Sequence, residues 1–454
     1  MAIIDEVEGD VNDNVKTTSD ALQTLRILAA YARYDALDAP TLDELDAWKA
    51  AALLTIHKLH DDPPIFLCPE EIAELIFAVA SFRGDGEWTS DEMSERASGI
   101  LTALVPETPV PVPLMDHILT HHLKPIFRPT PHPEINLETG RKLPRPAGGP
   151  LANQDAYEGQ VWKAHPGAGN VLQWVVENIE SDAYERLWYL VVPPTMTLLD
   201  DFEAKYKLQG VRVANALLSN APPDLLRRTG IADLLFSSLH RTLTHLHSPL
   251  TPALIRNAVP TAVKLVSRTT APGSERQFMQ LCALLGDGII GSVWMYGYQD
   301  ADAVEAGVDA LPDVVSALGI GTVRYLKALI PQLTHPLHLM PFNATRPSLQ
   351  LASLKALLCV MRECAPRVHA WRGTILEGAA KCWVGLVDAG KKDQDSMALK
   401  DLLREVCVSL AEFAPAAVED YRKLLALDSH MFEGLLGKIT SAPQPAPDAE
   451  ATEE

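Results

Sequence analysis

Residues Ser348–Cys364 read SLQLASLKALLCVMREC, and this stretch decides the predicted fold. Its large apolar side chains recur at spacings of three and four, as on one face of a helix: Leu351, Leu354, Leu357, Leu358 and Met361. Its other flank carries small apolar side chains: Ala352, Ala356 and Cys359. Two apolar stripes indicate burial on two sides, which a helix between neighbours in a stack requires.

Two later segments, Trp371–Val387 and Ala398–Phe413, repeat this pattern. An Ala-Pro pair follows the first and the third of these helices, and Pro366 and Pro415 lie 49 residues apart. That offset is close to the roughly 40–47 residues of a HEAT or armadillo unit. No segment alternates apolar and polar residues for long enough to demand a strand. The sequence therefore predicts an all-α chain, a HEAT/armadillo-like α-solenoid of stacked antiparallel helix pairs.

Residues 14–125 are expected to form an N-terminal helical block. Its candidate helices are Ser19–Tyr34, Leu42–His60, Pro69–Phe82, Ser90–Leu104 and Leu114–Lys124. Two of them begin with a capping-box pattern, in which a hydroxyl and a carboxylate three residues later satisfy free backbone N–H groups. The pairs are Thr41 with Glu44, and Thr89 with Glu92.

A Pro-rich loop or linker is expected over residues 126–153, because so many missing N–H donors exclude a helix. Beyond it, residues 154–440 are expected to form a C-terminal HEAT-like α-solenoid. Later prolines are expected to start, kink or end helices there: Pro193, Pro194, Pro222, Pro223, Pro260, Pro312, Pro331, Pro366 and Pro415. Residues 1–13 and 441–454 are acidic and are predicted to be disordered.

The net charge of −20 argues against direct binding to nucleic acid or to an anionic membrane, since both need clustered Lys and Arg. No apolar run of eighteen residues predicts a membrane span, and no signal peptide is evident. The six Cys residues show no CxxC spacing, which favours small buried side chains in a reducing compartment. The Asn343 sequon is therefore not expected to be glycosylated.

Two motifs resemble ligand-binding motifs but lack part of the required sequence pattern or structural context. Residues Gly286–Gly291 match GxGxxG, which binds a dinucleotide only when it follows a strand. The preceding Arg276–Leu285 is helical in pattern, with a possible cap at Ser274. Close helix packing or a helix break is therefore expected here instead of a dinucleotide site. Asp200 and Asp201 resemble the start of a magnesium-binding DDxxD box, whose fifth position here is alanine. These two carboxylates are expected to face solvent or to cap a helix.

Two loose histidine groups also lack the fixed partners of a zinc site: His117, His121 and His122, and then His240, His245 and His247. They are expected to be surface or partly buried side chains. No nucleophile elbow, Walker A loop or HExxH motif occurs. The sequence predicts no catalytic, cofactor-binding or metal-binding residues, and it leaves the partner-binding residues unknown.

The run PPTMTLLDD at residues 193–201, followed by Lys207 and Gly210, is similar to a motif of the second Tel-two-interacting subunit family (Tti-two) of the TTT co-chaperone complex. Supporting stretches are GRKLPR at 140–145, QVWK at 160–163, LRRTGI at 226–231 and YLKALIPQL at 325–333. The resemblance covers roughly residues 140–440. The motif also has a physical interpretation, in which Pro193 and Pro194 open a helix that runs through Lys207 and stops at Gly210.

The resemblance implies a non-enzymatic scaffold that binds Tel-two-like and Tti-one-like solenoid subunits. Together with the Hsp-ninety chaperone system, such a complex supports the phosphatidylinositol-kinase-related kinases of the mTOR, ATM and ATR class. Telomere maintenance, DNA-damage and nutrient signalling, and a cytoplasmic and nuclear location would follow. Two alternatives remain: another α-solenoid adaptor for transport or the cytoskeleton, and an all-helical metal-dependent enzyme that uses Asp200 and Asp201.

Overall fold

The computed structural model describes residues 42–61, 68–105, 110–147, 160–338 and 346–440, and five residues between Asp20 and Arg26. Within this part of the chain the regular structure is helical, and the one β-type pairing is an isolated bridge between Ile135 and Lys142. The all-α prediction of stacked helix pairs is confirmed. The chain divides into two compact units, Met1–Thr242 with Lys264–Thr269, and Leu243–Val263 with Thr270–Glu454.

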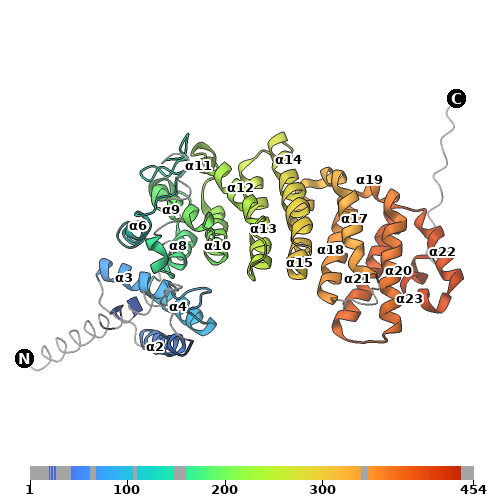
Figure 1. Ribbon diagram of the computed structural model, residues 1–454, viewed down its shortest axis with the longest axis horizontal. Helices are drawn as coiled ribbons and strands as arrows, with labels where there is room; N and C mark the ends of the chain where they lie inside the picture. Colours follow the sequence, from blue (N-terminus) through green and yellow to red (C-terminus); the bar gives the residue numbers. More distant parts are fainter. Residues whose placement is uncertain are drawn as a thin grey trace, which may run out of the picture. The chain divides into compact units, whose positions relative to one another are not determined.

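The first unit contains α2 to α12, a π-helical turn η1 and a 3₁₀ turn η2 (Figure 1). Their bounds are α2 Leu42–Asp61, α3 Pro69–Ala80, α4 Asp91–Leu104, α5 Val112–His117, η1 Ile118–Leu123, α6 Lys124–Phe127, η2 Val161–Ala164, α8 Ala168–Asn178, α9 Tyr184–Leu199, α10 Ala204–Asn220, α11 Pro223–Arg228 and α12 Ile231–Thr242. Helix α10 packs against both α8 and α9, and α4 packs against α2 and α3. Each of these helices thus buries its apolar face on a neighbour.

The second unit contains most of α13 and the helices that follow it, and the last residues of α13 belong to the first unit. The bounds are α13 Thr251–Thr269, α14 Glu275–Cys282, η3 Ala283–Trp294, α15 Ala301–Asp309, α16 Leu311–Leu318, η4 Gly319–Tyr325, α17 Leu326–Thr334, η5 His335–Leu337, α18 Pro347–Glu363, α19 Ala365–Val368, η6 His369–Trp371, α20 Arg372–Asp388, α21 Gln394–Phe413, α22 Ala417–Leu427 and α23 Ser429–Thr440.

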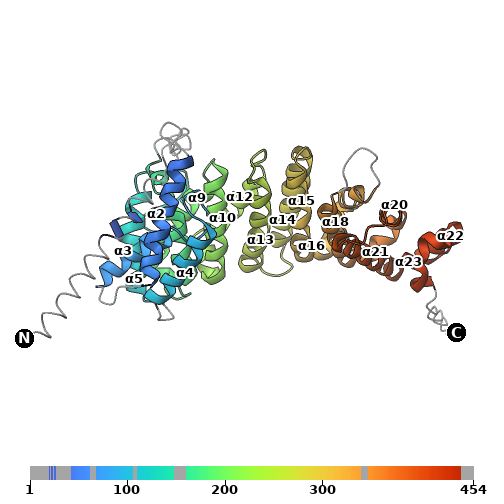
Figure 2. The same cartoon turned by 90° about the horizontal axis from the view of Figure 1, so that it is seen from below.

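Helix α18 lies between neighbours, as its two apolar stripes predict. It packs against α21 on one side and against α15, α16 and α17 elsewhere (Figures 1 and 2). Ala356 and Leu357 are fully buried, whereas Lys355 between the stripes is exposed. The two repeats of the pattern are also helices, α20 and α21. The spacing of apolar residues along the sequence is therefore enough to predict these three stacked helices.

Helix starts were predicted less accurately. Helix α4 is capped by Ser90, whose Oγ accepts from the backbone N–H of Met93 at 3.3 Å. The expected cap, Thr89, instead donates its hydroxyl to the carbonyl of Phe82 at 2.8 Å, so that capping box is wrong. Thr41 and most of Ser19–Tyr34 lie outside the described residues, as do the Asn343 sequon and the two acidic ends.

Four prolines that were expected to start, kink or end a helix lie inside helices of the described chain: Pro193 and Pro194 in α9, Pro260 in α13 and Pro331 in α17. An interior proline removes one helical hydrogen bond. In α9 both rings are buried, so apolar contact offsets part of that loss. Pro223, Pro312 and Pro366 do lie in the first turns of α11, α16 and α19, as expected.

One helical stretch of the described chain, Ala301–Leu337, is long and apolar enough by length and composition to cross a membrane. It is not a single rod, because α16 ends at Leu318 and the next residue, Gly319, has a φ of 56° that breaks the helix. Its three α-helices pack against α18, and α17 also packs against α20. Packing inside the second unit therefore accounts for its apolar composition.

The Pro-rich segment does not coincide with the division into units, since residues on both sides of it belong to the first unit. Its described part, Arg128–Ala147, follows α6 and consists of turns. Backbone hydrogen bonds hold these turns together, for example from Asn136 N–H to the Arg141 carbonyl at 2.9 Å. This part of the segment is an ordered loop, which we call the basic loop for the charges described below.

Candidate functional site: the α9 motif and the basic loop

The run PPTMTLLDD forms the C-terminal half of α9 and the turn after it. The helix ends at Leu199, and α10 begins at Ala204, so the single helix from Pro193 to Lys207 that the sequence predicted is wrong. Gly210 does not stop a helix either, because it lies inside α10. A Cβ atom added there would come within 2.3 Å of the Leu199 backbone nitrogen, so glycine permits α9 and α10 to touch.

Asp200 is largely buried and is held by a histidine from the basic loop. His132 Nε2 lies 3.1 Å from Asp200 Oδ2, and the two side chains are 5% and 12% exposed. The backbone N–H of Glu134 donates to His132 Nδ1 at 3.2 Å, which leaves the proton on Nε2 to be donated to the carboxylate. Arg241 of α12 lies 3.7 Å away on the other oxygen. The motif thus ties α9 to the loop and to α12.

Burial alone would raise the pKa of Asp200. The hydrogen bond and charge of His132, a hydrogen bond from Ser238 and the charge of Arg241 together outweigh this, so the pKa of Asp200 is lowered. Asp200 is therefore an ionised carboxylate at neutral pH, with His132 at one oxygen and Arg241 near the other.

Asp201 is fully buried, and its side chain lies against Lys163. Lys163 Nζ lies 3.1 Å from its Oδ2 and also contacts Glu203 Oε1 at 2.5 Å. The backbone N–H of Glu203 donates to Asp201 Oδ1 at 2.8 Å. Burial raises the pKa of Asp201 in spite of these partners. The expectation that Asp200 and Asp201 face solvent is wrong, because each closes a buried or nearly buried polar contact between distant segments.

Lys207 stabilises the turn between α9 and α10. Its Nζ donates to the Leu199 carbonyl at 2.9 Å, which satisfies a carbonyl at the end of α9 that has no helical partner. Burial lowers the pKa of Lys207. We call Asp200, Asp201, Lys163, Lys207 and His132 the ionic cluster. Its geometry is that of a clamp between helices, in which Asp200 contacts His132 and Asp201 contacts Lys163.

The arrangement gives no support to a metal-dependent enzyme. Among the described residues, no group of three or more His, Cys, Asp or Glu side chains lies close enough to hold a metal ion. A magnesium site needs several converging oxygen ligands, whereas Asp200 contacts His132 and Asp201 contacts Lys163, so the two carboxylates have different partners.

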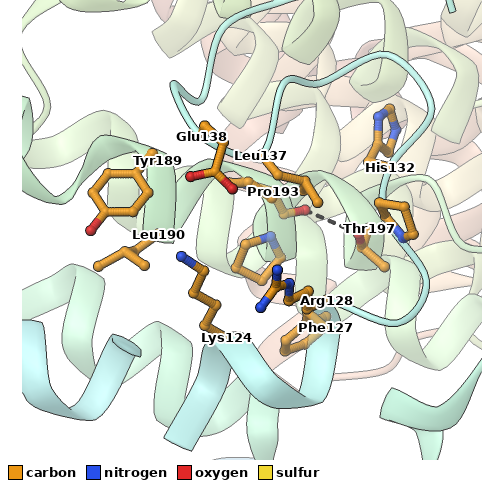
Figure 3. Close-up of a pocket in the computed structure, with 12 residues that line it drawn as sticks. Lys124, Phe127, Arg128, His132, Leu137, Glu138, Tyr189, Leu190, Pro193 and Thr197 are labelled. Atoms are coloured by element: carbon orange, nitrogen blue, oxygen red, sulfur yellow. Dashed lines mark hydrogen bonds between the residues drawn. The ribbon is translucent and has the colours of Figure 1, made fainter. Parts of the chain in front are cut away.

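The basic loop is seated on α9 and lines a pocket with it (Figure 3). Gly140 has a φ of 63°, and a Cβ there would approach the backbone of Trp188 and Tyr189 to 3.0 Å. Lys142 N–H donates to the Thr229 carbonyl at 2.9 Å. The pocket is floored by Leu190, Pro193, Pro194 and Thr197 of α9, and edged by Lys124, Arg128, Leu137 and Glu138.

This pocket has a volume of about 30 Å³, room for little more than one water molecule. A larger, open cavity of about 740 Å³ lies where α8 and α10 end, among acidic and amide side chains such as Glu177, Glu180, Asp182 and Asn220. Small-molecule sites are mostly apolar and enclose most of their ligand. The motif pocket is too small for such a site, and the larger cavity is too polar.

The first histidine group lies at the end of α5 (His117) and on the π-helical turn η1 (His121 and His122), and these side chains do not form a metal site. His117 and His121 have ring centroids 4.3 Å apart, and His122 stacks on Phe77 at 5.1 Å. Burial, assisted by the charges of His117, Arg26 and His121, lowers the pKa of His122 to about 4. The second group is split, since His240 belongs to the first unit, and His245 and His247 belong to the second.

The glycine motif and most cysteines are packing features. Gly286, Gly288 and Gly291 lie within η3, and a Cβ on Gly286 would touch the Tyr325 ring at 2.9 Å, so close packing and not a helix break is observed. Ser274 caps α14 as expected. Four cysteines are buried, Cys282, Cys364, Cys382 and Cys407, while Cys359 is half-buried and Cys68 is exposed.

The partners of the motif carboxylates were missed from the sequence. His132 and Lys163 precede Asp200 and Asp201 by 68 and 38 residues, and no local spacing links them. The one available signal was Lys163, which lies in the QVWK stretch that resembles the same family, whereas His132 lies outside the stretches of resemblance.

Comparison with known proteins assigns the chain to a family. The family model described as Tti2 family matches residues 75–343, which include α9, the basic loop and the ionic cluster. TELO2-interacting protein 2 of Mus musculus is 23% identical over 287 residues, 55% of this chain and 52% of that protein. The Rattus norvegicus protein of the same name is 23% identical over 90 residues, 20% of this chain and 17% of that one.

The chain thus spans about half the length of the mouse relative it matches, and less of the rat one. A solved crystal structure of an engineered protein aligns with 96% of this chain and 100% of its own at 15% identity, but its TM-score of 0.42 supports no inference. Because the family model covers more than half of the residues, the chain belongs to the Tti2 (Tti-two) family.

Proposed function

We propose that this protein is a scaffold subunit of a TTT-like co-chaperone complex, in which it binds Tel-two-like and Tti-one-like solenoid subunits. The family match over residues 75–343 carries this proposal. The printed name of the mouse relative, a TELO2-interacting protein, supports the first partner. Contact with the Hsp-ninety machinery and with phosphatidylinositol-kinase-related kinases is then indirect, and the expected location is cytoplasmic and nuclear.

Stacked helices suit a scaffold protein, because they offer long binding faces whose shape depends on helix packing and not on a flexible loop. The ionic cluster stiffens the first unit at the motif, and the two-sided helix α18 does so in the second. We infer that the protein has no catalytic step of its own and acts by holding its partners, thereby supporting kinase folding and abundance, and through them telomere maintenance, DNA-damage responses and nutrient signalling.

The test is affinity purification of the tagged full chain followed by mass spectrometry. The expected result is stoichiometric recovery of two solenoid proteins of the Tel-two and Tti-one type. Depletion of the chain should lower the steady-state levels of several kinases of the mTOR, ATM and ATR class without lowering their mRNA. Recovery of coat or cytoskeletal proteins in their place, with kinase levels unchanged, would point to the transport or cytoskeletal adaptor.

A further inference from the structure

The basic loop with α6 carries charge opposite to that of the whole chain. Between residues 124 and 147 there are five cationic side chains, Lys124, Arg128, Arg141, Lys142 and Arg145, and two acidic ones, Glu134 and Glu138. The chain as a whole has a net charge of −20. A local excess of positive charge in an acidic protein attracts an anionic partner to that place alone.

These cations are available for a partner. None of the five lies within ion-pair distance of a carboxylate of the described chain, and four of them are exposed, Arg128, Arg141, Lys142 and Arg145. Elsewhere in the first unit, Arg83, Arg212 and Arg228 are each paired with an acidic side chain. The cations of the basic loop differ from these three arginines in having no acidic partner among the described residues.

A groove passes beneath these cations. The motif pocket adjoins a second pocket of about 210 Å³, and Glu138 and Tyr189 line both. Lys124 and Arg128 edge the first pocket, and Arg141 edges the second. Figure 3 shows Lys124 and Glu138 on opposite sides of the first pocket, and Lys124 Nζ lies 5.2 Å from the centre of the Tyr189 ring.

The groove is preformed. Gly140, the backbone hydrogen bond from Lys142 to Thr229, and the contact of His132 with Asp200 all fix the loop on α9 and its neighbours. Its floor is apolar, with Leu190, Pro193 and Pro194. A preformed groove costs a ligand less ordering free energy than a mobile loop would.

We propose that this groove binds an extended, acidic segment of a partner protein, with its carboxylates on Lys124, Arg128 and Arg141. Long polyanions fit less well, since nucleic acid and anionic membranes engage many cations at once and would be repelled by the rest of this surface. The inference rests on the proposed scaffold function and adds the chemistry of one bound segment.

The experiment is a fluorescence-anisotropy titration of the purified full chain with a short labelled peptide of Asp and Glu around one Leu. Saturable binding that weakens with added salt is expected, because charge pairs at an exposed rim are screened. The double variant Arg128→Glu/Arg141→Glu should weaken binding roughly tenfold or more. Glu138→Gln, which removes the carboxylate from the groove, should strengthen binding, and no loss of folding can mimic that gain.

The matched control is Lys391→Glu/Lys392→Glu, two exposed cations in the turn after α20 of the second unit, which changes the net charge equally. It should leave peptide affinity within about twofold of wild type. Equal weakening by both double variants would overturn the proposal, because only overall charge would then matter. Tighter binding of a single-stranded oligonucleotide or of anionic lipid vesicles, lost in Arg128→Glu/Arg141→Glu, would also overturn it.

The affinity purification and the peptide titration together separate the scaffold proposal from the groove proposal. If wild-type chain recovers its solenoid partners but does not bind the peptide, the groove inference fails and the scaffold function stands. If the peptide binds and no solenoid partner is recovered, the groove stands without that function.

Discussion

At the scale of single residues, the buried carboxylate Asp201 shows how the structure changes an expectation. A solvent-facing Asp201 could be replaced at a cost of about 0.5 kcal/mol or less. Because its side chain is fully buried against Lys163, Asp201→Ala should instead cost about 3 kcal/mol in the free energy of unfolding. Asp201→Asn should cost less, since the amide oxygen still accepts from the Glu203 N–H. Chemical denaturation measures both, and an Asp201→Ala protein as stable as wild type would show that the carboxylate is not buried.

Gly210 offers a second test at this scale. Gly210→Ala should destabilise the protein by about 3 kcal/mol, because the new methyl group would overlap the Leu199 backbone, which cannot move freely. The matched control is Gly373→Ala in the first turn of α20, where a Cβ meets nothing within 4 Å. That change should stabilise the protein by ~0.5–1 kcal/mol through helix propensity. Equal melting temperatures for the two variants would contradict the close contact of α9 and α10.

His122 predicts a pH dependence. Its pKa is about 4 in the folded chain, below its ordinary value of 6.5, because burial disfavours the charged ring. The unfolded chain therefore takes up the proton first, so the stability that neutral His122 provides is complete above pH 6.5 and is lost as pH falls toward 4. His122→Phe keeps the stack on Phe77 and removes the titration. Its melting temperature should fall less than that of wild type between pH 7 and about pH 5, by an amount equivalent to ~1 kcal/mol. Equal falls for the two proteins would contradict the prediction.

The residue scale is also where sequence reasoning reached its limit. Asp200 and Asp201 stand out in the sequence, but whether they face solvent depends on His132, Lys163 and Arg241, and none of these lies near them in the chain. Burial is a property of tertiary packing, and no propensity or spacing records it.

At the scale of helices, prediction worked where the apolar pattern is strong. The spacing in α18, α20 and α21 is set by which face each helix buries, so periodicity alone found them. Prediction from the sequence was less accurate at helix ends and at prolines. Ser90 and Thr89 are chemically equivalent caps, and only the hydroxyl geometry distinguishes them. Pro193 and Pro194 signal a helix end locally, but α9 continues through them because their rings are buried.

The α18 sandwich gives the element-scale prediction. Ala356→Glu should cost on the order of 3–5 kcal/mol, because it places a charge at a fully buried position with no evident partner. Lys355→Glu, at the exposed position beside it, should change stability by less than about 0.5 kcal/mol. Thermal melting and partner pull-down test both. An Ala356→Glu protein that melts like wild type yet loses its partner would place Ala356 in a binding groove and not between helices.

At the scale of the whole molecule, the two compact units predict how damage spreads. In stacked helices each element is supported by its neighbours, so one broken interface releases several. Ala356→Glu should raise amide hydrogen exchange in α15, α16, α17 and α21, which contact α18, before it does so in α8, α9 and α10 of the first unit. Hydrogen-exchange mass spectrometry measures this order. A simultaneous rise in both units would show one cooperative transition and not two.

The distribution of cysteines has a practical consequence for studying the protein. Burial raises the pKa of Cys364 to about 11 and of Cys382 and Cys407 to about 12, and buried thiols of this kind react slowly with maleimides. Cys68, at the start of α3, is exposed. Cys68 is therefore the most exposed thiol of the chain, with Cys359 half-buried, and a fluorophore attached at Cys68 without mutagenesis could be used to follow partner assembly on the first unit.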